Sequence, residues 1–459
     1  MAYRENKTKP TDPGNITQFE LFQANGESSI DISDSAVEIK YFENLLSNTK
    51  TLSIVVVETG NTEGGEANKK GVLDGLPVRG GEKALLVMED MQPTKNKLEF
   101  KDDNAWYVNR VRDASPDTQK GIYAIDFSSK EFFSNEQNRV CKRYDGKVSD
   151  TIKKLLTEDT ANGMGIKTER DLTIDDTLTN YNFIGNDKKP FYICTWLASK
   201  SIPETAGELG GAAGYLFYGN YDGFHFRSID ALFDQEPKKK YIYQGQPGIP
   251  GGYDDEIISY NINKDIDLQN NLMSGTYSNR SIFFDFYACD YQIRDFSVDD
   301  DLSTPGSGSS KDKLVSAGVD PIDSVADEFR KPISRYMNHI LDVGTLPSGK
   351  NQEEQLKTWK DDPYKPTYDV ANTMVQSIMR YNQLYSIQID IMIPGDFSLR
   401  AGDLVYCDFP ELTTERSAQV NDQSGGIYMI ASLCHRLTSR DTYTSLTLVR
   451  DSFGRKSFK

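Results

Sequence analysis

One stretch of the chain matches the pattern of a phosphate-binding loop. Residues 344–350, Gly-Thr-Leu-Pro-Ser-Gly-Lys, have the form G-x-x-x-x-G-K, in which backbone amides and the lysine, here Lys350, hold phosphate groups. Asn351 follows where such loops carry a Ser or Thr to bind magnesium, and an expected helix precedes the stretch where a buried strand is required. Because Gly commonly follows the last turn of a helix, we interpret the stretch as a helix end and a loop.

The residue types that bind metals or act as nucleophiles are few and widely spaced. The three histidines, which show no H-x-x-x-H or H-E-x-x-H spacing, are His225, His339 and His435. The five cysteines, an odd number without a C-x-x-C pair, are Cys141, Cys194, Cys289, Cys407 and Cys434. No G-x-S-x-G elbow occurs either. The sequence therefore predicts no catalytic, cofactor-binding or metal-binding residues, no cofactor and no enzymatic activity.

Paired carboxylates are the one feature that could serve a glycoside hydrolase. Asp254 with Asp255 and Asp361 with Asp362 are adjacent pairs, but 69 Asp and Glu residues make close pairs inevitable. The 25 Tyr and 3 Trp residues could line a sugar groove, although aromatic residues in strands are mostly core or interface. A secreted β-rich glycoside hydrolase and a carbohydrate-binding adhesin stay open as alternatives, and both ordinarily need a signal peptide that residues 1–7 do not resemble.

Charge and hydropathy argue against two kinds of partner, nucleic acids and membranes. The 459 residues predict roughly three domains and carry a net charge of −17. The only dense basic run is 238–240, so tight binding of a nucleic-acid backbone is not expected. The aliphatic runs are too short to cross a bilayer, which argues against membrane insertion. Residues 299–313 begin with three Asp and continue with Gly and Ser, a composition that predicts a flexible loop.

Two patterns divide the first half of the chain. Short apolar or alternating runs separated by Gly, Asp, Asn and Pro predict a first β-barrel domain over residues 1–130. These runs are Ile54–Val57, Lys83–Met88, Lys97–Phe100, Trp106–Val111 and Gly121–Phe127. The period then becomes helical: Val148, Ile152, Leu155 and Leu156 share one face of a helix over 148–157, and a second helix begins at Pro190. Residues 131–210 are thus expected to form a helical insert.

The second half predicts a discontinuous β domain. Over residues 385–393 Tyr385 and four Ile residues alternate with Ser386, Gln388, Asp390 and Met392, and further strands are expected at 403–407, 427–437 and 443–449. A hairpin over 214–227 turns at Gly219-Asn220-Tyr221-Asp222-Gly223 and is expected to complete the same sheet. The second barrel would therefore comprise 211–245 and 380–453. Between them, 246–379 is expected to be an inserted α/β region with one helix opened by Pro332 and another from about Tyr368, capped by Thr367.

Four passages resemble the central baseplate hub proteins of contractile-tailed bacteriophages of the T-even type. Residues 387–405 resemble an alternating strand followed by PGD, a hydrophobic residue and AGDL, and residues 215–230 resemble a YLFY…DGF.F.SID hairpin. Residues 76–82 resemble an LPI.GGE turn, and residues 135–147 an NE..RV.K.Y.GK passage before a helix. The patterns extend over nearly the whole chain, and the family is related to the N-terminal half of the type VI secretion spike protein.

The resemblance implies a fold, an assembly and partners. The fold is mainly β with helical insertions (α+β), with two tandem tail-tube-like β-barrels per chain and a homotrimer that forms a pseudo-sixfold ring. The function implied is structural: the hub connects the tail tube to the central spike and encloses a channel for tape-measure protein and DNA, which passes without specific binding. Further partners are the baseplate wedge components. The expected location is the virion tail baseplate, assembled in the host cytoplasm.

Overall fold

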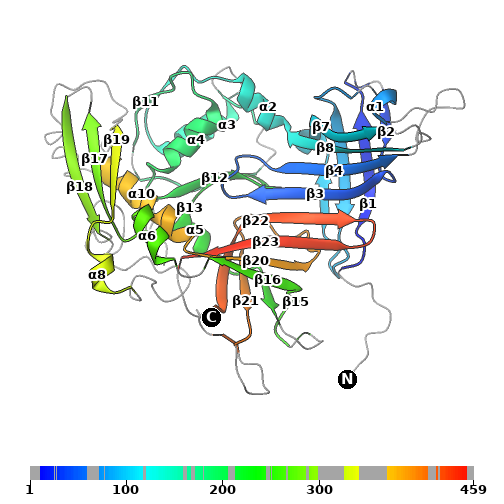
Figure 1. Ribbon diagram of the computed structural model, residues 1–459. Coiled ribbons are helices and arrows are strands. Elements are labelled where there is room, and N and C mark those ends of the chain that lie inside the picture. Colours follow the sequence, from blue (N-terminus) through cyan, green and yellow to red (C-terminus); the bar gives the residue numbers. More distant parts are fainter. Residues whose placement is uncertain are drawn as a thin grey trace, which may run out of the picture.

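A computed structural model shows a mainly β protein with helices inserted between strands (Figure 1). It describes residues 11–24, 26, 28–58, 72–76, 78–116, 120–158, 163–166, 171–178, 180–204, 212–243, 249, 251–264, 267–285, 289–297, 325–340, 370–411, 420–421 and 424–451. The expected loop at 299–313, the stretch at 344–350, Asp361, Asp362 and the start of the helix near Tyr368 lie outside these residues. The predicted α+β class is confirmed.

The largest element is a sheet of 15 strands that joins both ends of the chain. Its N-terminal strands are β1 (Asn15–Phe22), β2 (Ser29–Asp31), β3 (Ala36–Asn44), β4 (Thr51–Glu58), β5 (Lys83–Glu89), β6 (Lys97–Phe100), β7 (Trp106–Pro116) and β8 (Gly121–Ser129). Its later strands are β14 (Lys239–Ile242), β15 (Asp255–Glu256), β16 (Ser259–Lys264), β20 (Ile387–Pro394), β21 (Leu404–Asp408), β22 (Gly426–Thr438) and β23 (Thr442–Arg450). The expected strands are all present.

The two strand groups are hydrogen-bonded to each other. Strand β22 pairs antiparallel with β3, from Ser432 opposite Asn44 to Thr438 opposite Glu38. The 13 residues of β22 allow this, because its first half pairs with β21 and its second half with β3. The strands expected in two separate barrels thus share one sheet, and the described strands form no closed barrel.

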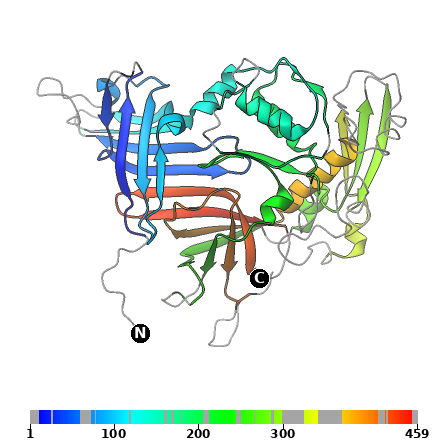
Figure 2. The ribbon, with the colours of Figure 1, turned by 180° about the vertical axis from the view of Figure 1, so that it is seen from behind.

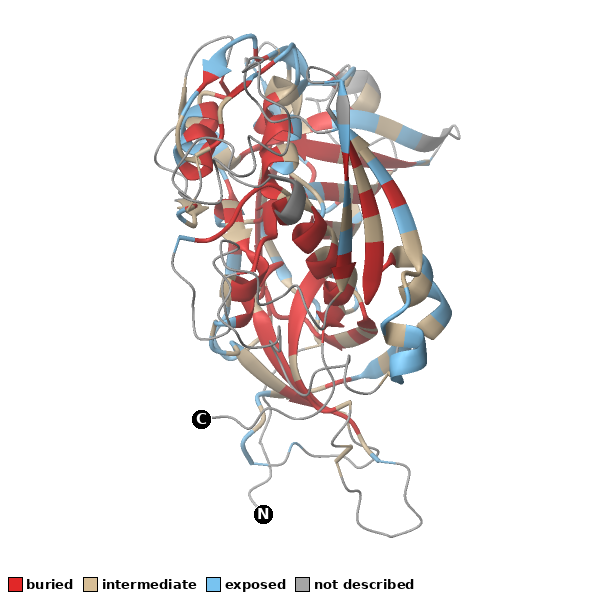
Figure 3. Cartoon of the chain, turned by 90° about the vertical axis from the view of Figure 1, so that its left-hand side faces the viewer, coloured by how far each residue is buried: buried red, intermediate tan, exposed pale blue. Residues whose placement is uncertain are grey.

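Alternation along β20 builds the core of this sheet. Ile387, Ile389, Ile391 and Ile393 are each at most 3% exposed, as their period of two predicts. They lie in one apolar cluster with residues of the N-terminal strands, such as Phe19 and Trp106. Figure 3 shows buried positions along the inner strands and helices, with exposed positions alternating along the surface strands. The predicted register of β20 is confirmed.

The central hairpin is present, but its predicted partner is wrong. Strands β12 (Tyr215–Gly219) and β13 (Gly223–Ser228) pair with each other, and β13 pairs in parallel with β10 (Asp171–Ile174) in a separate sheet. Neither hairpin strand pairs with a described C-terminal strand, and the side chains of Leu216 and Tyr218 share an apolar cluster with Leu404. Phe217 points to the opposite side, into the cluster of the helical insert. Packing on both faces explains why every residue of β12 is buried.

The helical insert contains the two predicted helices. Helix α3 (Val148–Thr157) buries its predicted apolar face, and α4 (Pro190–Ala198) begins at its proline. Around them lie α2 (Lys130–Gln137), α5 (Ile229–Phe233) and the short strands β9 (Arg143–Tyr144) and β11 (Phe183–Ile184). Two short helical turns, α1 (Val72–Gly75) and Asp102–Asn104, lie in the N-terminal strand group. The domain boundaries proposed from the sequence stay a prediction.

A third region contains a small sheet, and here the helix expected from Pro332 is wrong. Strand β19 (Arg335–Ile340) runs parallel to β17 (Ser278–Asp285), which pairs antiparallel with β18 (Asp290–Ser297). The expected helical stripe of Tyr336, Met337 and Ile340 splits in two, because Met337 is buried whereas the other two are 65% exposed. Helices α6 (Leu268–Ser274), α8 (Asp327–Arg330) and α10 (Val370–Leu384) complete the region, and α10 corresponds to the second expected helix.

Candidate functional site

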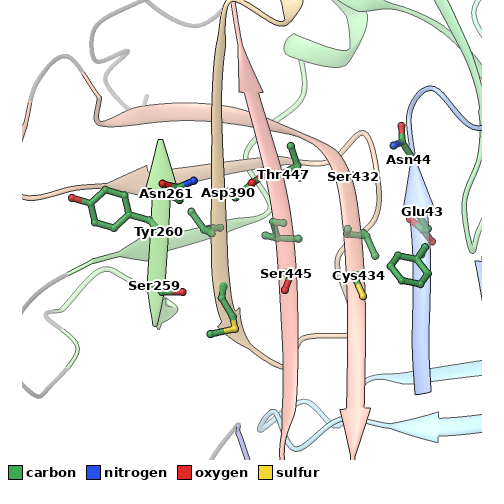
Figure 4. A pocket seen from close by; sticks show the side chains of 15 residues that line it. Glu43, Asn44, Ser259, Tyr260, Asn261, Asp390, Ser432, Cys434, Ser445 and Thr447 are labelled. Carbon is green, nitrogen blue, oxygen red and sulfur yellow. The ribbon is translucent and has the colours of Figure 1, made fainter. Parts of the chain in front are cut away.

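A hollow lies on the solvent side of the large sheet. It has a volume of about 530 Å³ and lies across β16, β20, β23, β22 and β3 (Figure 4). Besides the buried Glu43, its lining includes the partly or fully exposed polar residues Asn44, Ser259, Asn261, Asp390, Ser432, Ser445 and Thr447. They reach the surface because they alternate with the buried row, as Asp390 does with Ile389 and Ile391. No Lys, Arg or His is among the residues that line the hollow.

The hollow offers hydroxyl, amide and carboxylate groups but no activated nucleophile. Its one thiol, Cys434, has its pKa raised to about 11 by burial, so the thiol stays protonated. The adjacent His435 cannot act as its base, because consecutive strand residues point to opposite faces and His435 is 1% exposed in the core. The hollow therefore offers hydrogen-bonding groups beside apolar side chains such as Phe42 and Met392, a mixed surface for contact with another molecule.

His435 packs in the core as a neutral ring. Its Nδ1 lies 2.9 Å from Thr444 Oγ1, and the ring stacks on Tyr41 with centroids 5.9 Å apart. Burial, with a smaller contribution from the Arg400 charge, lowers the pKa of His435 to about 3. The residue therefore belongs to the packing of the sheet.

The buried imidazole predicts a pH dependence of stability. The unfolded chain takes up a proton near the ordinary His pKa of about 6.5, whereas the folded chain does so only at about 3. The His435 contribution is therefore complete above about pH 6.5 and is lost between there and about pH 3, at up to about 1.4 kcal/mol per pH unit. Denaturant unfolding at pH 7, 6, 5 and 4 measures the slope. We expect a shallower slope in His435→Leu, and equal slopes in both proteins would contradict this role.

The other singled-out residues are dispersed. His225 Nε2 lies 2.8 Å from Asn220 Oδ1 in the hairpin turn, and His339 stacks on Phe283 in the small sheet at 5.0 Å. Burial lowers the pKa of His339, and burial raises the pKa of Asp255. Asp254 Oδ2 accepts a hydrogen bond from the backbone amide of Lys240, at 2.8 Å. In the described part of the chain no group of three or more His, Cys, Asp or Glu could hold a metal ion.

A buried carboxylate that sequence reasoning missed joins three distant segments. Glu43 Oε1 accepts hydrogen bonds from Tyr41 Oη at 2.6 Å and from the Tyr221 amide at 2.7 Å, and its Oε2 accepts one from the Ala401 amide at 2.8 Å. Burial raises the pKa of Glu43, and the nearby Arg400 opposes that rise. Arg400 also covers the Tyr221 ring at 4.5 Å. The one sign of it in the sequence was that Glu43 shares the core-facing row of β3 with Ile39 and Tyr41.

The AGD passage, residues 401–403, packs closely against the hairpin. Gly402 has a φ of +94°, and a Cβ atom there would lie 2.5 Å from Tyr218 Oη. A side chain at this position would meet both backbone strain and a collision. The motif therefore has a structural purpose, which is to let β12 approach the turn that precedes β21.

A second buried network lies where α10 meets the hairpin and the C-terminal strand. Arg380 is 1% exposed, and its Nη2 and Nε lie 2.7 and 3.0 Å from Asp230 Oδ1. Its Nη1 lies 2.5 Å from Asp451 Oδ2. Burial raises the pKa of Asp230 although Arg380 opposes the rise. Asp230 is the last residue of the SID passage, so the motif again serves the junction between segments.

Comparisons with known proteins show what the chain resembles in sequence and in fold. The chain is 22% identical over 289 residues to the probable baseplate hub protein gp334 of Vibrio phage KVP40. The 43 kDa tail protein of prophage MuSo2 from Shewanella oneidensis has a similar fold, with a TM-score of 0.51 and 9% identity over 95% of this chain and 98% of that one. The chain resembles a phage baseplate hub protein in sequence and phage tail proteins in fold. The predicted resemblance to bacteriophage hub proteins is thus confirmed.

Further comparisons define the extent of the likeness. A tail protein from Neisseria meningitidis MC58 aligns with a TM-score of 0.52 and 10% identity, over 95% of this chain and 96% of that one. The sequence match to the Vibrio phage hub protein covers 61% of each protein. No protein-family model matches the chain. Among the described residues, no helix is long and apolar enough to span a membrane.

Proposed function

We propose that this chain is a structural baseplate hub protein, three copies of which join the tail tube to the central spike around a channel. The single observation that carries the proposal is the sequence likeness to a phage hub protein together with the fold of phage tail proteins. In this proposal the two strand groups of the large sheet would be the two tube-like units of each copy. The relatives are named as tail components and not as enzymes, so the hydrolase and adhesin alternatives gain no support.

Charge suits the hollow face of the sheet to a channel wall. Its lining is rich in small hydroxyl side chains and lacks basic residues. Three copies would carry a net charge of three times −17, or −51. In this proposal the hollow, which carries the Asp390 carboxylate and no basic side chain, repels phosphate groups, so DNA can pass it without binding. The tape-measure protein would pass along the same face.

Unpaired sheet edges support a closed ring. Among the described strands, β16 pairs only with β20, and β2 pairs only with β1. Exposed strand edges invite uncontrolled pairing between chains, and a closed cyclic assembly can cover them. The spike, the tube and the baseplate wedge would bind the ring outside the channel, in a virion tail assembled in the host cytoplasm.

The mass of the native particle tests the ring. We expect a single species of three times 51.7 kDa, or about 155 kDa, by mass photometry or light scattering, because cyclic closure limits growth. Negative-stain images should then show a ring with a central hole. A stable 51.7 kDa monomer at micromolar concentration, unchanged when spike or tube protein is added, would count heavily against the proposal.

A further inference from the structure

The small sheet has two faces of opposite character. Its inner face packs on the rest of the protein: Phe283 and Phe296 lie in one cluster with Val375 and Met379 of α10. Its outer face, hereafter the outer β17–β19 face, carries large apolar side chains that are 41 to 65% exposed. These are Phe284, Tyr291, Ile293, Tyr336 and Ile340. In a monomeric protein such a group is unusual and indicates an interaction surface.

Strand register places these side chains together. Phe284 lies opposite Tyr291 on β18 and opposite Ile340 on β19, and the rings of Phe284 and Tyr291 are 6.3 Å apart. Ile293 lies two residues further along β18, on the same face. The sheet lies at the end of the molecule remote from β1, and no described helix or strand covers its outer side (Figures 1 and 2). The face is therefore accessible to a second molecule.

The face is electrically neutral, unlike the chain as a whole. Among its described residues the charged side chains are Arg280 and Asp295, which pair with Nε to Oδ1 at 2.5 Å and Nη2 to Oδ2 at 2.6 Å, and the guanidinium lies 5.8 Å from the Tyr336 ring. The whole chain carries −17, so two copies repel each other over most of their surface. Like-charged copies can approach with least repulsion where a surface has no net charge and much apolar area. Aromatic residues and Arg are also the types enriched in interface cores.

We infer that the outer β17–β19 face is a contact surface between copies of this chain. This rests on the proposed function, since a closed ring of three copies needs a contact on each side of every subunit. In a cyclic trimer the contact is heterologous, so the face meets a different surface of the neighbouring copy. The apolar side chains supply the attraction, and the Arg280–Asp295 pair satisfies its own charges within one copy.

Single substitutions in the full chain test the face. Ile293→Asp places a charge in its middle, and Ile184→Asp is the matched control, with 53% and 59% exposed side chains respectively. We expect Ile293→Asp to raise the subunit dissociation constant about 30-fold or more, as for a central interface residue, and Ile184→Asp to leave it unchanged. Dilution series by mass photometry measure the constant, and circular dichroism melting confirms that both variants fold.

The oligomeric states of the wild type and of Ile293→Asp test the contact surface and the trimer separately. If the wild type and Ile293→Asp are equally stable trimers, the inference is overturned and the trimer stands. If the wild type is a dimer that Ile293→Asp dissociates, the inference holds and the trimer fails. A monomeric wild type overturns both.

Chemical labelling of the unmodified protein covers the case in which Ile293→Asp does not fold. Tyr336 and Tyr192 are 65% and 53% exposed in the single chain. Tetranitromethane should nitrate Tyr192 but not Tyr336 in the assembled particle, and both after dilution to monomer. Equal nitration of the two in the particle would overturn the inference, as would protection of Tyr336 only after spike or tube protein is added.

Discussion

Ile389→Asp is expected to abolish cooperative folding of the large sheet. Ile389 is 1% exposed, and lies between Ile262 of β16 and Leu448 of β23 in the antiparallel register. Removing such a side chain costs about 2–5 kcal/mol, and a carboxylate buried there without a partner adds several more. The total approaches the whole stability of a typical domain, about 5–15 kcal/mol. Circular dichroism melting should show a broad transition at a much lower temperature, or no transition.

The neighbouring residue provides the control. Gln388 lies on the opposite face of the same strand and is only partly buried. We expect Gln388→Ala to change the unfolding free energy by less than about 1 kcal/mol. A neutral Ile389→Asp together with a severe Gln388→Ala would mean that the strand faces the other way, and the assigned register would be wrong.

The facing of β20 was predictable because its pattern fits only one period. Five apolar residues at every second position over 385–393 alternate with Ser386, Gln388, Asp390 and Met392, a pattern that no helix can sort onto one face. Residues 333–341 lack this clarity. Apolar side chains at 333, 336, 337, 340 and 341 fit a helical stripe, yet the segment pairs in parallel with β17. A partner strand more than 50 residues earlier decided the structure, and the local pattern does not contain that information.

For the hairpin, too, local residues predicted the turn but not the partner strand. Its turn was predictable, because Gly and Asn at 219–223 accept the backbone angles that a tight turn needs. Its partner was not, since β10 is a strand of only four residues and pairs through backbone atoms. The buried contact from Glu43 to Ala401 spans 358 positions in the sequence. A single sequence offers no means to match two such residues.

The polar character of the hollow was predictable from the sequence, but its position was not. Alternation places Gln388 and Asp390 on the surface of β20, so a polar face was expected there. The hollow itself exists because β3, from the beginning of the chain, pairs with β22 beside β23 and β20. The sequence assigned β3 and β22 to different domains, so this pairing was not expected.

Arg380→Met is expected to be the most damaging change outside the large sheet. It leaves Asp230 and Asp451 buried at 4% and 2% exposure without the guanidinium that now lies within 3.0 Å of both. Removing one partner of a buried ion pair costs about 3–5 kcal/mol, because the remaining charge stays uncompensated. The loss should separate α10 from the hairpin and the C-terminal strand. Chemical denaturation at pH 7 measures the unfolding free energy.

Two controls test whether the stability loss of Arg380→Met comes from a buried charge: an exposed ion pair, and the pH dependence of the loss. Arg110 pairs with Asp126 at 2.8 Å but is 65% exposed, so Arg110→Met should cost less than about 1 kcal/mol. In the wild type the Arg380 charge opposes the rise that burial causes in the pKa of Asp230. Arg380→Met removes this opposition, so the pKa of Asp230 rises further in the variant. A carboxyl with a raised folded-state pKa favours folding at low pH and loses that contribution as the pH rises above its unfolded value of about 4. The defect of Arg380→Met should therefore shrink from pH 7 toward pH 4.

Replacing the carboxylates together with the arginine separates charge from packing. If uncompensated charge causes the loss, Arg380→Met combined with Asp230→Asn and Asp451→Asn should recover part of the stability at pH 7, because neutral amides cost less to bury. Recovery would mean that Arg380 stabilises the junction of α10, the hairpin and the C-terminal strand mainly by compensating the buried charge of the two carboxylates. A defect that is as mild as that of Arg110→Met, or that does not change with pH, would instead mean that the apolar cluster around Leu384 and Phe233 holds these segments without help from the ions.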